Sequence, residues 1–177
     1  MEDLHEKFMR EALKEAEGSL AAGEFPVGCV LAADGEIVSR GRRINSCGRV
    51  LTELDHAEIV ALRNLDRPGA AACKNLVVYC TMEPCLMCYS TLLLNGVRTV
   101  VYGYEDVMGG GLCLAFDCLS PLYRQMNPRV IPNVLRNESL SLVQQFFRNP
   151  SNRYWEDSLL ARYTLQQEVK GGSTSQP

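Results

Sequence analysis

Long apolar runs are absent from this 177-residue sequence, and none approaches the roughly 20 residues that span a bilayer. The first residues are charged and contain no apolar segment of the kind found in signal peptides. We therefore expect no membrane contact and a cytoplasmic location, in which thiols stay reduced. The eight cysteines also lack the regular spacing of a disulfide framework, so we expect free thiols and metal ligands.

An excess of positive charge is also missing, because 18 Lys and Arg residues stand against 21 Asp and Glu residues. The net charge of −3 argues against a general nucleic-acid-binding protein. One local cluster differs, since Arg40, Arg42, Arg43 and Arg49 lie in a stretch without acidic residues. Two interpretations of this cluster remain open: a solvated strand edge, or contacts with the phosphates of a nucleotide or RNA.

Internal repeats and linker-like segments are absent as well. The composition, 46% hydrophobic and 22% charged, is typical of an ordinary globular domain. We expect one domain over residues 1–168, with a C-terminal helix near residues 151–167. Residues 169–177 are rich in glycine and serine, and we expect them to form a disordered tail.

Periodic patterns predict helices that alternate with strands. Leu4, Phe8 and Ala12 begin a spacing of four residues that is typical of an amphipathic helix. Asp34 and Gly35 form a hairpin signal between two short runs with strand character. The expected helices cover residues 3–22, 56–65, 85–94, 139–148 and 151–167, and the expected strands cover residues 27–33, 36–42, 75–82, 99–104 and 129–134.

Some details of these elements bear on function. Asp55 is expected to cap the second helix, which places His56 in the first turn. Pro84 is expected in the first turn of the third helix. The strand–helix–strand order over residues 75–104 implies a right-handed parallel crossover. The glycine-rich loop over residues 105–117 is expected to connect flexibly and to border the pocket.

Soft metal ligands meet in one stretch of the chain. His56, Cys85 and Cys88 supply three of them, one short of a closed tetrahedron, which is typical of a catalytic zinc site. The two cysteines are three residues apart, so on a helix they share one face, and a helix N-terminus favours thiolates. Glu58 stands two residues after the histidine and is a candidate proton carrier.

Two other interpretations of this stretch compete with a catalytic zinc. A CxxC pair is also a redox dithiol, but that reaction gives His56 and Glu58 no role. A structural zinc needs a fourth protein ligand. The candidates for that ligand are Cys29, Cys47, Cys73 and Cys80. On a regular helix His56 and Glu58 point about 200° apart, so the pocket has to lie off the helix end.

The order H-x-E and then P-C-x-x-C is the zinc deaminase signature. On these motifs the chain resembles the cytidine and deoxycytidylate deaminase superfamily over nearly all of residues 3–148. Within the superfamily it is most similar to the bacterial tRNA adenosine deaminases. The matching stretches are residues 24–31, Asn45, residues 56–63, residues 82–88 and residues 98–103.

The resemblance implies a three-layer α/β/α cytidine deaminase-like fold with a five-stranded mixed sheet, assembled as a homodimer. It also implies that His56, Cys85 and Cys88 bind one Zn²⁺ per chain, with a water or hydroxide as the fourth ligand. Glu58 is then the catalytic residue, which carries a proton from this water to the ring nitrogen and then to the leaving amine.

The resemblance further implies substrate contacts at Asn45, Pro26, Val27 and Ala57, although Asn45 can also be an ordinary loop residue. The expected enzyme is a hydrolase that releases ammonia from an amino-bearing nucleobase, with adenosine in a tRNA anticodon loop as the favoured substrate. A free base or nucleoside, of guanine or cytosine type, is the first alternative. A non-catalytic zinc or RNA-binding module is the alternative from another class.

The departures from the tRNA enzymes concern the substrate pocket. Leu54-Asp55 stands where those enzymes typically carry Thr-Ala. The loop that contains Gly109-Gly110-Gly111 lacks their lysine. Tyr154 and Trp155 replace a basic C-terminal helix, and they serve either to stack on a base or as packing anchors.

Overall fold

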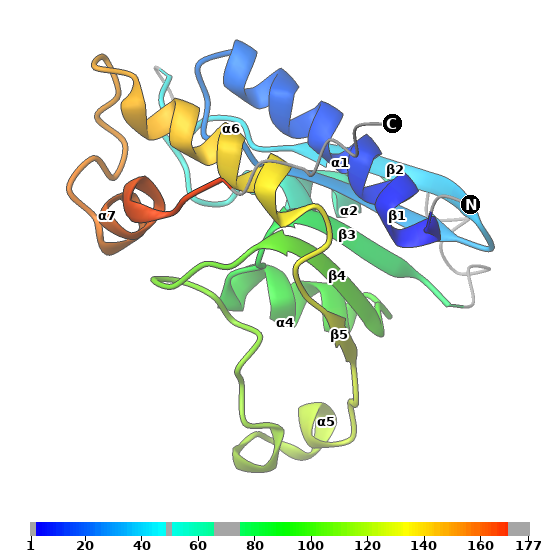
Figure 1. The fold of residues 1–177 in the computed structure, drawn as a ribbon. Coiled ribbons are helices and arrows are strands. Elements are labelled where there is room, and N and C mark those ends of the chain that lie inside the picture. The colour runs from blue at the N-terminus through cyan, green and yellow to red at the C-terminus, as the bar shows by residue number, and fades with distance from the viewer. Residues whose placement is uncertain (1–2, 49–50, 66–74, 170–177) are drawn as a thin grey trace, which may run out of the picture.

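The computed structural model describes residues 3–48, 51–65 and 75–169 of the chain. Its centre is a five-stranded sheet with the order β2-β1-β3-β4-β5 (Figure 1). β1 pairs antiparallel with β2 and β3, whereas β4 runs parallel to both β3 and β5, so the sheet is mixed as predicted. The strands are β1 (Gly28–Ala33), β2 (Glu36–Arg42), β3 (Val77–Met82), β4 (Thr99–Tyr104) and β5 (Arg129–Ile131).

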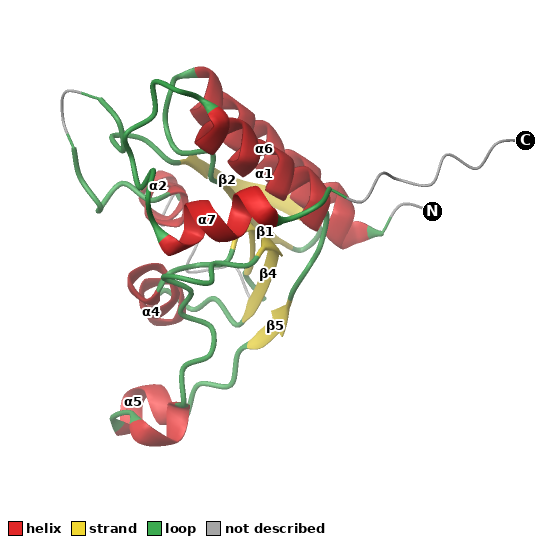
Figure 2. Ribbon diagram, turned by 60° about the vertical axis from the view of Figure 1, so that its left-hand side comes forward, coloured by secondary structure: helices red, strands yellow, loops and turns green. Residues whose placement is uncertain are grey.

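Helices cover both faces of the sheet, which confirms the predicted three-layer α/β fold. Figures 1 and 2 show α1 and α6 on one face and α2 and α4 on the other. The helices are α1 (Leu4–Ala21), α2 (Ala57–Asn64), α4 (Leu86–Leu94), α5 (Pro121–Arg124), α6 (Arg136–Arg148) and α7 (Leu159–Gln166), with a 3₁₀ turn, η1 (Phe116–Cys118). None of these helices has the length and hydropathy that crossing a bilayer requires within the described residues.

β1 is buried along its whole length because apolar clusters form on both of its faces. Val30 belongs to the cluster that contains Phe8 of α1. Leu31, the next residue, belongs to the cluster that contains Ala61 of α2. This alternation follows from the two-residue period of a strand, and it explains why β1 reads as a continuous apolar run.

The position of α2 depends on Gly41 in β2. A Cβ atom at residue 41 would lie 2.2 Å from the Ala57 carbonyl oxygen and 2.3 Å from the Ala61 nitrogen. Because those atoms belong to the helix backbone, they cannot move aside for a larger side chain. The glycine therefore lets the N-terminal turn of α2 rest directly on the sheet.

Three local predictions were wrong. His56 itself is the N-cap of α2, while the Asp55 carboxylate accepts hydrogen bonds from Asn45 and Arg63 and is not a cap. Cys85 is the N-cap of α4, so Pro84 precedes the helix instead of starting it.

The third error concerns the predicted helix over residues 151–167, because α7 begins only at Leu159. Trp155 has a left-handed backbone with φ of 52°, which interrupts a helix, and Ser158 then caps α7 by accepting from the Ala161 nitrogen. Arg49, Cys73 and residues 170–177 of the predicted tail lie outside the described residues. The other seven cysteines are free thiols, as expected.

Candidate metal centre and active site

Two helix N-termini position the candidate metal ligands. His56 has an extended backbone directly before α2, and Cys85 has an extended backbone directly before α4. Cys88 lies in the first turn of α4 and is fully buried. The positive ends of two helix dipoles therefore converge on the thiol and imidazole groups, which favours anionic sulfur.

The three predicted ligands come together in space. The Nδ1 atom of His56 lies 3.5 Å from the sulfur of Cys85 and 3.5 Å from the sulfur of Cys88. The ligand atoms all lie within 4.8 Å of one another, and they form the one such cluster among the described residues. Two thiol sulfurs and one imidazole nitrogen are the donors that zinc prefers, and three of them leave a fourth position open.

The electrostatics of the two thiol groups, Cys85 and Cys88, also suit a divalent cation. The hydrogen bond with Cys88, supported by that with His56, lowers the pKa of Cys85 to about 4. The same contact and the burial of the sulfur raise the pKa of Cys88. The donor set fits zinc, because a bound cation stabilises both thiolates at once.

Glu58 lies beside these donors and is 3% exposed. Burial is the largest cause of a raised pKa for its carboxyl group, although the charge of His56 opposes the shift. Since His56 is an N-cap outside the helix and Glu58 lies within the first turn, both side chains reach one cavity. The expected divergence of about 200° applies only to two residues of a regular helix and does not arise here.

A cavity joins this cluster to the surface. Val27 and Ala57 line it together with His56, Glu58 and Cys85. Phe25, Arg43, Met82, Glu83, Asp106, Gly109, Tyr154 and Trp155 complete the lining. The glycine-rich loop therefore does border the pocket. Tyr154 and Trp155 stack on each other at 4.6 Å between ring centroids and form an aromatic wall.

Two predicted substrate contacts lie elsewhere. Among the described residues, Pro26 and Asn45 are not part of the cavity lining. Pro26 is buried. The side-chain amide of Asn45 donates to the Asp55 carboxylate at 2.8 Å, in a loop with a left-handed backbone at residue 45. The substrate roles of both residues stay predictions.

The arginine cluster is dispersed by the fold. Arg40 forms ion pairs with Glu11 and Glu15 of α1. The Arg42 side chain lies over Gly18 of the same helix. Arg43 is 2% exposed and pairs with Glu53. Arg40 and Arg43 are therefore paired with carboxylates of the chain. Arg42 is exposed at the end of β2, in agreement with the strand-edge interpretation.

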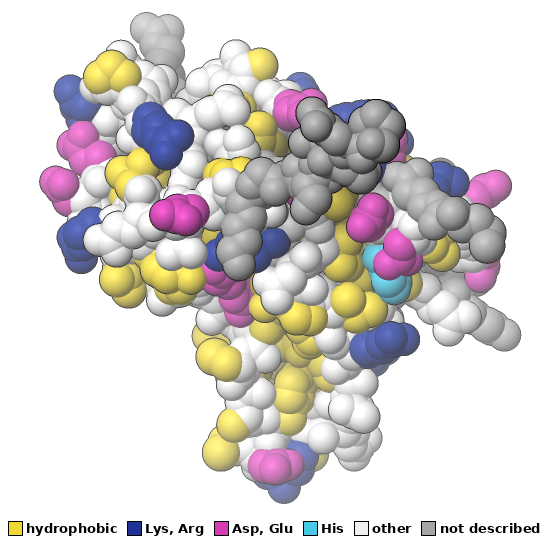
Figure 3. Space-filling model, in the orientation of Figure 1, with side chains coloured by type: hydrophobic (Ala, Val, Ile, Leu, Met, Phe, Trp, Pro, Cys, Tyr) yellow, Lys and Arg dark blue, Asp and Glu magenta, His cyan; other side chains and the backbone are white. Residues whose placement is uncertain are grey.

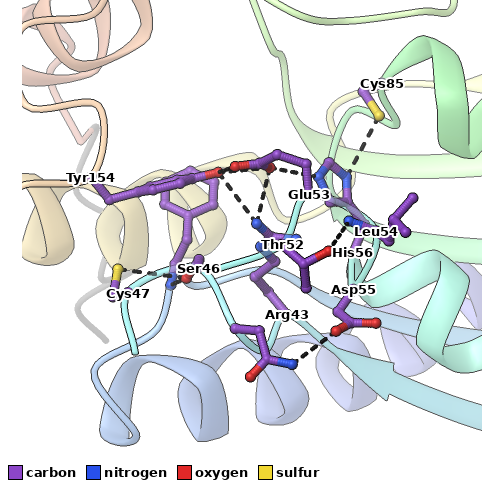
Figure 4. Close-up of polar contacts among 12 residues, drawn as sticks. Arg43, Ser46, Cys47, Thr52, Glu53, Leu54, Asp55, His56, Cys85 and Tyr154 are labelled. Carbon is purple, nitrogen blue, oxygen red and sulfur yellow. Dashed lines mark hydrogen bonds and ion pairs between the residues drawn. The ribbon is translucent and has the colours of Figure 1, made fainter. Parts of the chain in front are cut away.

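Sequence reasoning missed the acidic residues around the cavity. Glu53 lies 3.3 Å from the Nε2 atom of His56 (Figure 4). Glu83 accepts from the backbone nitrogens of Asp106 and Leu112 and fixes the glycine-rich loop. The only signal for Glu53 was its place three residues before His56. For Glu83, the signal was its place directly before Pro84.

The mixed sheet and the three soft donors beside a buried carboxylate define an α/β protein with a candidate catalytic metal centre. The family described as the cytidine and deoxycytidylate deaminase zinc-binding region matches residues 2–104. The chain therefore belongs to this deaminase family. It is accordingly an enzyme, of the class that hydrolyses C–N bonds of nucleobases and nucleosides.

Relatives agree with this assignment. The chain is 33% identical over 147 residues to a tRNA-specific adenosine deaminase of Streptococcus pyogenes serotype M1, an alignment that covers 82% of this chain and 85% of the relative. A tRNA-specific adenosine deaminase of Bacillus subtilis strain 168 is 31% identical, with coverages of 81% and 88%. A structure from work on A-to-I editing by tRNA:A34 deaminases gives a TM-score of 0.64 at 27% identity, and covers 77% of this chain and 98% of that one.

Proposed function

We propose that this protein is a zinc-dependent hydrolase that deaminates adenosine in a tRNA anticodon loop. One observation carries the catalytic part of the proposal: the donors of His56, Cys85 and Cys88 gather beside the buried carboxyl group of Glu58. The names of relatives at 33% and 31% identity support the substrate. A binding module that only holds zinc has no need of a buried acid at this place.

In the proposed reaction His56, Cys85 and Cys88 hold the zinc ion. When bound there, zinc lowers the pKa of a coordinated water and supplies a hydroxide nucleophile at neutral pH. The Glu58 carboxylate accepts the proton of that water and delivers it to the ring nitrogen beside the amino-bearing carbon. With the hydroxide oxygen bonded to that carbon, Glu58 would take the remaining proton of the new hydroxyl group and pass it to the amino group. The C–N bond would then break, so that ammonia leaves and the hydroxyl becomes the carbonyl of the product. The raised pKa of Glu58 suits a group that must both accept and return a proton.

The pocket supports recognition of a base by its faces and edges. Tyr154 and Trp155 present stacked rings at the cavity, and stacking on such rings suits any nucleobase. Val27 and Ala57 provide apolar lining beside the metal ligands. The phosphates of a tRNA would need partners other than Arg40 and Arg43, because both pair with carboxylates of this chain.

We also propose that the protein acts in the cytosol as a homodimer. The surface of α4 supports association of two copies, since the helix sequence LMCYSTLLL contains no charged residue. Leu86 and Leu94 at its two ends are each 54% exposed. Interfaces between proteins are depleted in charge and rich in apolar groups of this kind.

The test is ammonia release by the zinc-loaded protein. The substrates are a tRNA anticodon stem-loop with adenosine at the wobble position, free adenosine, adenine, guanine, cytosine and cytidine. We expect deamination of the stem-loop and inosine in the product, with little or no activity on the small molecules. Activity on the free bases or nucleosides alone would refute the tRNA proposal. Zinc binding without activity on any substrate would favour a non-catalytic module.

A further inference from the structure

The two ring nitrogens of His56 have different partners. Nδ1 faces the sulfurs of Cys85 and Cys88 at 3.5 Å each. Nε2 lies 3.3 Å from the Oε2 atom of Glu53. A nitrogen that ligates a metal must present a lone pair, so the proton of a neutral imidazole has to reside on the other nitrogen. With Nδ1 bound to a metal, Nε2 would carry the proton and donate a hydrogen bond to Glu53.

Glu53 is itself held by two donors from distant parts of the chain. The Nη2 atom of Arg43 donates to Oε2 at 3.0 Å, and the Tyr154 hydroxyl donates to the same carboxylate at 3.2 Å and 3.3 Å (Figure 4). The Glu53 side chain is 60% exposed, so on its own it would move freely. With two donors and His56 as a third, the carboxylate has one preferred position.

Arg43 and Tyr154 are in turn fixed by the fold. Arg43 is 2% exposed, and its backbone nitrogen donates to the Val27 carbonyl oxygen at 2.8 Å. A buried guanidinium requires an anionic partner, and Glu53 provides it. The backbone nitrogen of Tyr154 donates to the Asn152 side chain at 2.8 Å, and its ring packs against Phe25. Arg43, directly after β2, and Tyr154, in the C-terminal segment, thus hold the Glu53 carboxylate in place.

We propose that Glu53 is a positioning residue, which orients the His56 imidazole with Nε2 protonated and Nδ1 directed at the metal, and that Arg43 and Tyr154 hold Glu53 in this role. Carboxylates that accept from a metal-bound histidine raise its basicity and fix its ring. The inference rests on the zinc site of the proposed function. It connects the segment around Tyr154 with the metal, a link that no motif in the sequence indicates.

The experiment measures zinc affinity by competition with a chromogenic chelator, independently of deamination. Glu53→Ala is expected to weaken zinc binding about 10-fold. This is the lower end of the range for residues that hydrogen-bond a metal ligand, because the Glu53 carboxylate is exposed. Glu53→Gln keeps an acceptor oxygen and is expected to give an intermediate affinity. The matched control is Glu156→Ala, which removes another exposed carboxylate from an ion pair with an arginine. Its affinity should equal that of the wild type.

Two further measurements separate positioning from general stability. Tyr154→Phe is expected to weaken zinc binding in the wild-type background but to have no effect in the Glu53→Ala background, because the hydroxyl acts through Glu53. The chain has only two histidines, so nitrogen-15 NMR of the zinc-loaded protein reports on His56 directly. We expect its Nε2-bound proton to be protected from water exchange in the wild type and unprotected in Glu53→Ala.

Unchanged zinc affinity in Glu53→Ala, to within twofold, would refute the inference. An equal loss in the Glu156→Ala control would also refute it, since the effect would then be one of general stability. Failure of the proposed function gives a different result: the wild type would bind zinc and respond to Glu53→Ala, but would release no ammonia. A wild type that binds no zinc would refute both.

Discussion

At the scale of single residues, the main result is that His56 and Glu58 lie on opposite sides of the N-terminal boundary of α2. His56 lies outside the helix as its N-cap and offers Nδ1, whereas Glu58 lies inside the helix and is almost completely buried. A histidine in the first helical turn would have directed these two groups apart. The backbone change at the helix boundary therefore brings a candidate metal ligand and a candidate proton carrier to one cavity.

This arrangement predicts the effect of Glu58→Gln. The amide keeps the size of the side chain but cannot accept the proton, so kcat/KM should fall by about 10²- to 10⁴-fold, while zinc content stays at one ion per chain. Glu17→Gln, on the exposed face of α1, serves as the control and should keep full activity. Ammonia release and metal analysis on the same samples provide the measurement. Equal activity in Glu58→Gln would show that another group moves the proton.

At the scale of elements, a partly buried ion pair connects the helices to the sheet. Glu105 follows β4, and Arg136 at the start of α6 donates to both of its carboxylate oxygens. The Tyr163 hydroxyl of α7 donates to the same carboxylate at 2.8 Å. Burial by itself raises the pKa of Glu105, but the hydrogen bonds from Arg136 and Tyr163 outweigh it and lower the pKa below 4.5.

Glu105→Gln should therefore reduce the free energy of unfolding near pH 7 by about 1–2 kcal/mol. A lowered pKa in the folded state stabilises the protein above the unfolded value of 4.5, and this contribution disappears as the pH falls through the lower folded value. The difference between wild type and variant should thus shrink below pH 4.5. Urea titrations at pH 7 and at lower pH test this, with Glu36→Gln in the exposed hairpin as control. A difference that persists at low pH would exclude the ionic contribution.

The elements also show what could be predicted from the sequence. β2 and β4 have the predicted bounds, because the Asp34-Gly35 turn and short runs of residues with strand character are local signals. The prediction of a helix from residue 151 was wrong. Trp155 has a left-handed backbone, stacks on its neighbour Tyr154 and packs against Phe25, which is distant in the sequence. Local periodicity contains no information about such tertiary contacts.

The same distinction applies to the site. His56, Cys85 and Cys88 could be predicted as ligands from residue type and spacing, and the fold does bring them together. The contacts of Glu53 could not be predicted, because its partners Arg43 and Tyr154 meet it only when the chain folds. The sequence likewise grouped the arginines as one basic cluster, whereas the fold pairs Arg40 with α1 and buries Arg43.

At the scale of the whole molecule, exposed apolar residues occur on the projection that the segment between β4 and β5 forms. Figure 3 shows hydrophobic side chains along the projection below the sheet, where the segment between β4 and β5 extends away from the body. Leu122 of α5 in this segment is 60% exposed, and Leu94 of α4 is 54% exposed. Exposed apolar groups that occur together commonly mark a contact surface, and an uncharged helix beside them fits a second copy of the chain.

This surface predicts the behaviour of Leu94→Glu. If α4 lies in a homodimer interface, a charge at its C-terminal end cannot be desolvated without a large cost, so the variant should sediment as a monomer of 19.7 kDa. The wild type should sediment at twice that mass under the same conditions. Leu94 lies at the end of α4 opposite to Cys85, so zinc content should not change.

The control, Leu4→Glu, changes a leucine on α1 that is 52% exposed, and it should remain dimeric. A wild type that sediments at 19.7 kDa would refute the dimer itself. A dimeric Leu94→Glu would instead place the interface on another face, because an exposed leucine outside an interface tolerates the charge.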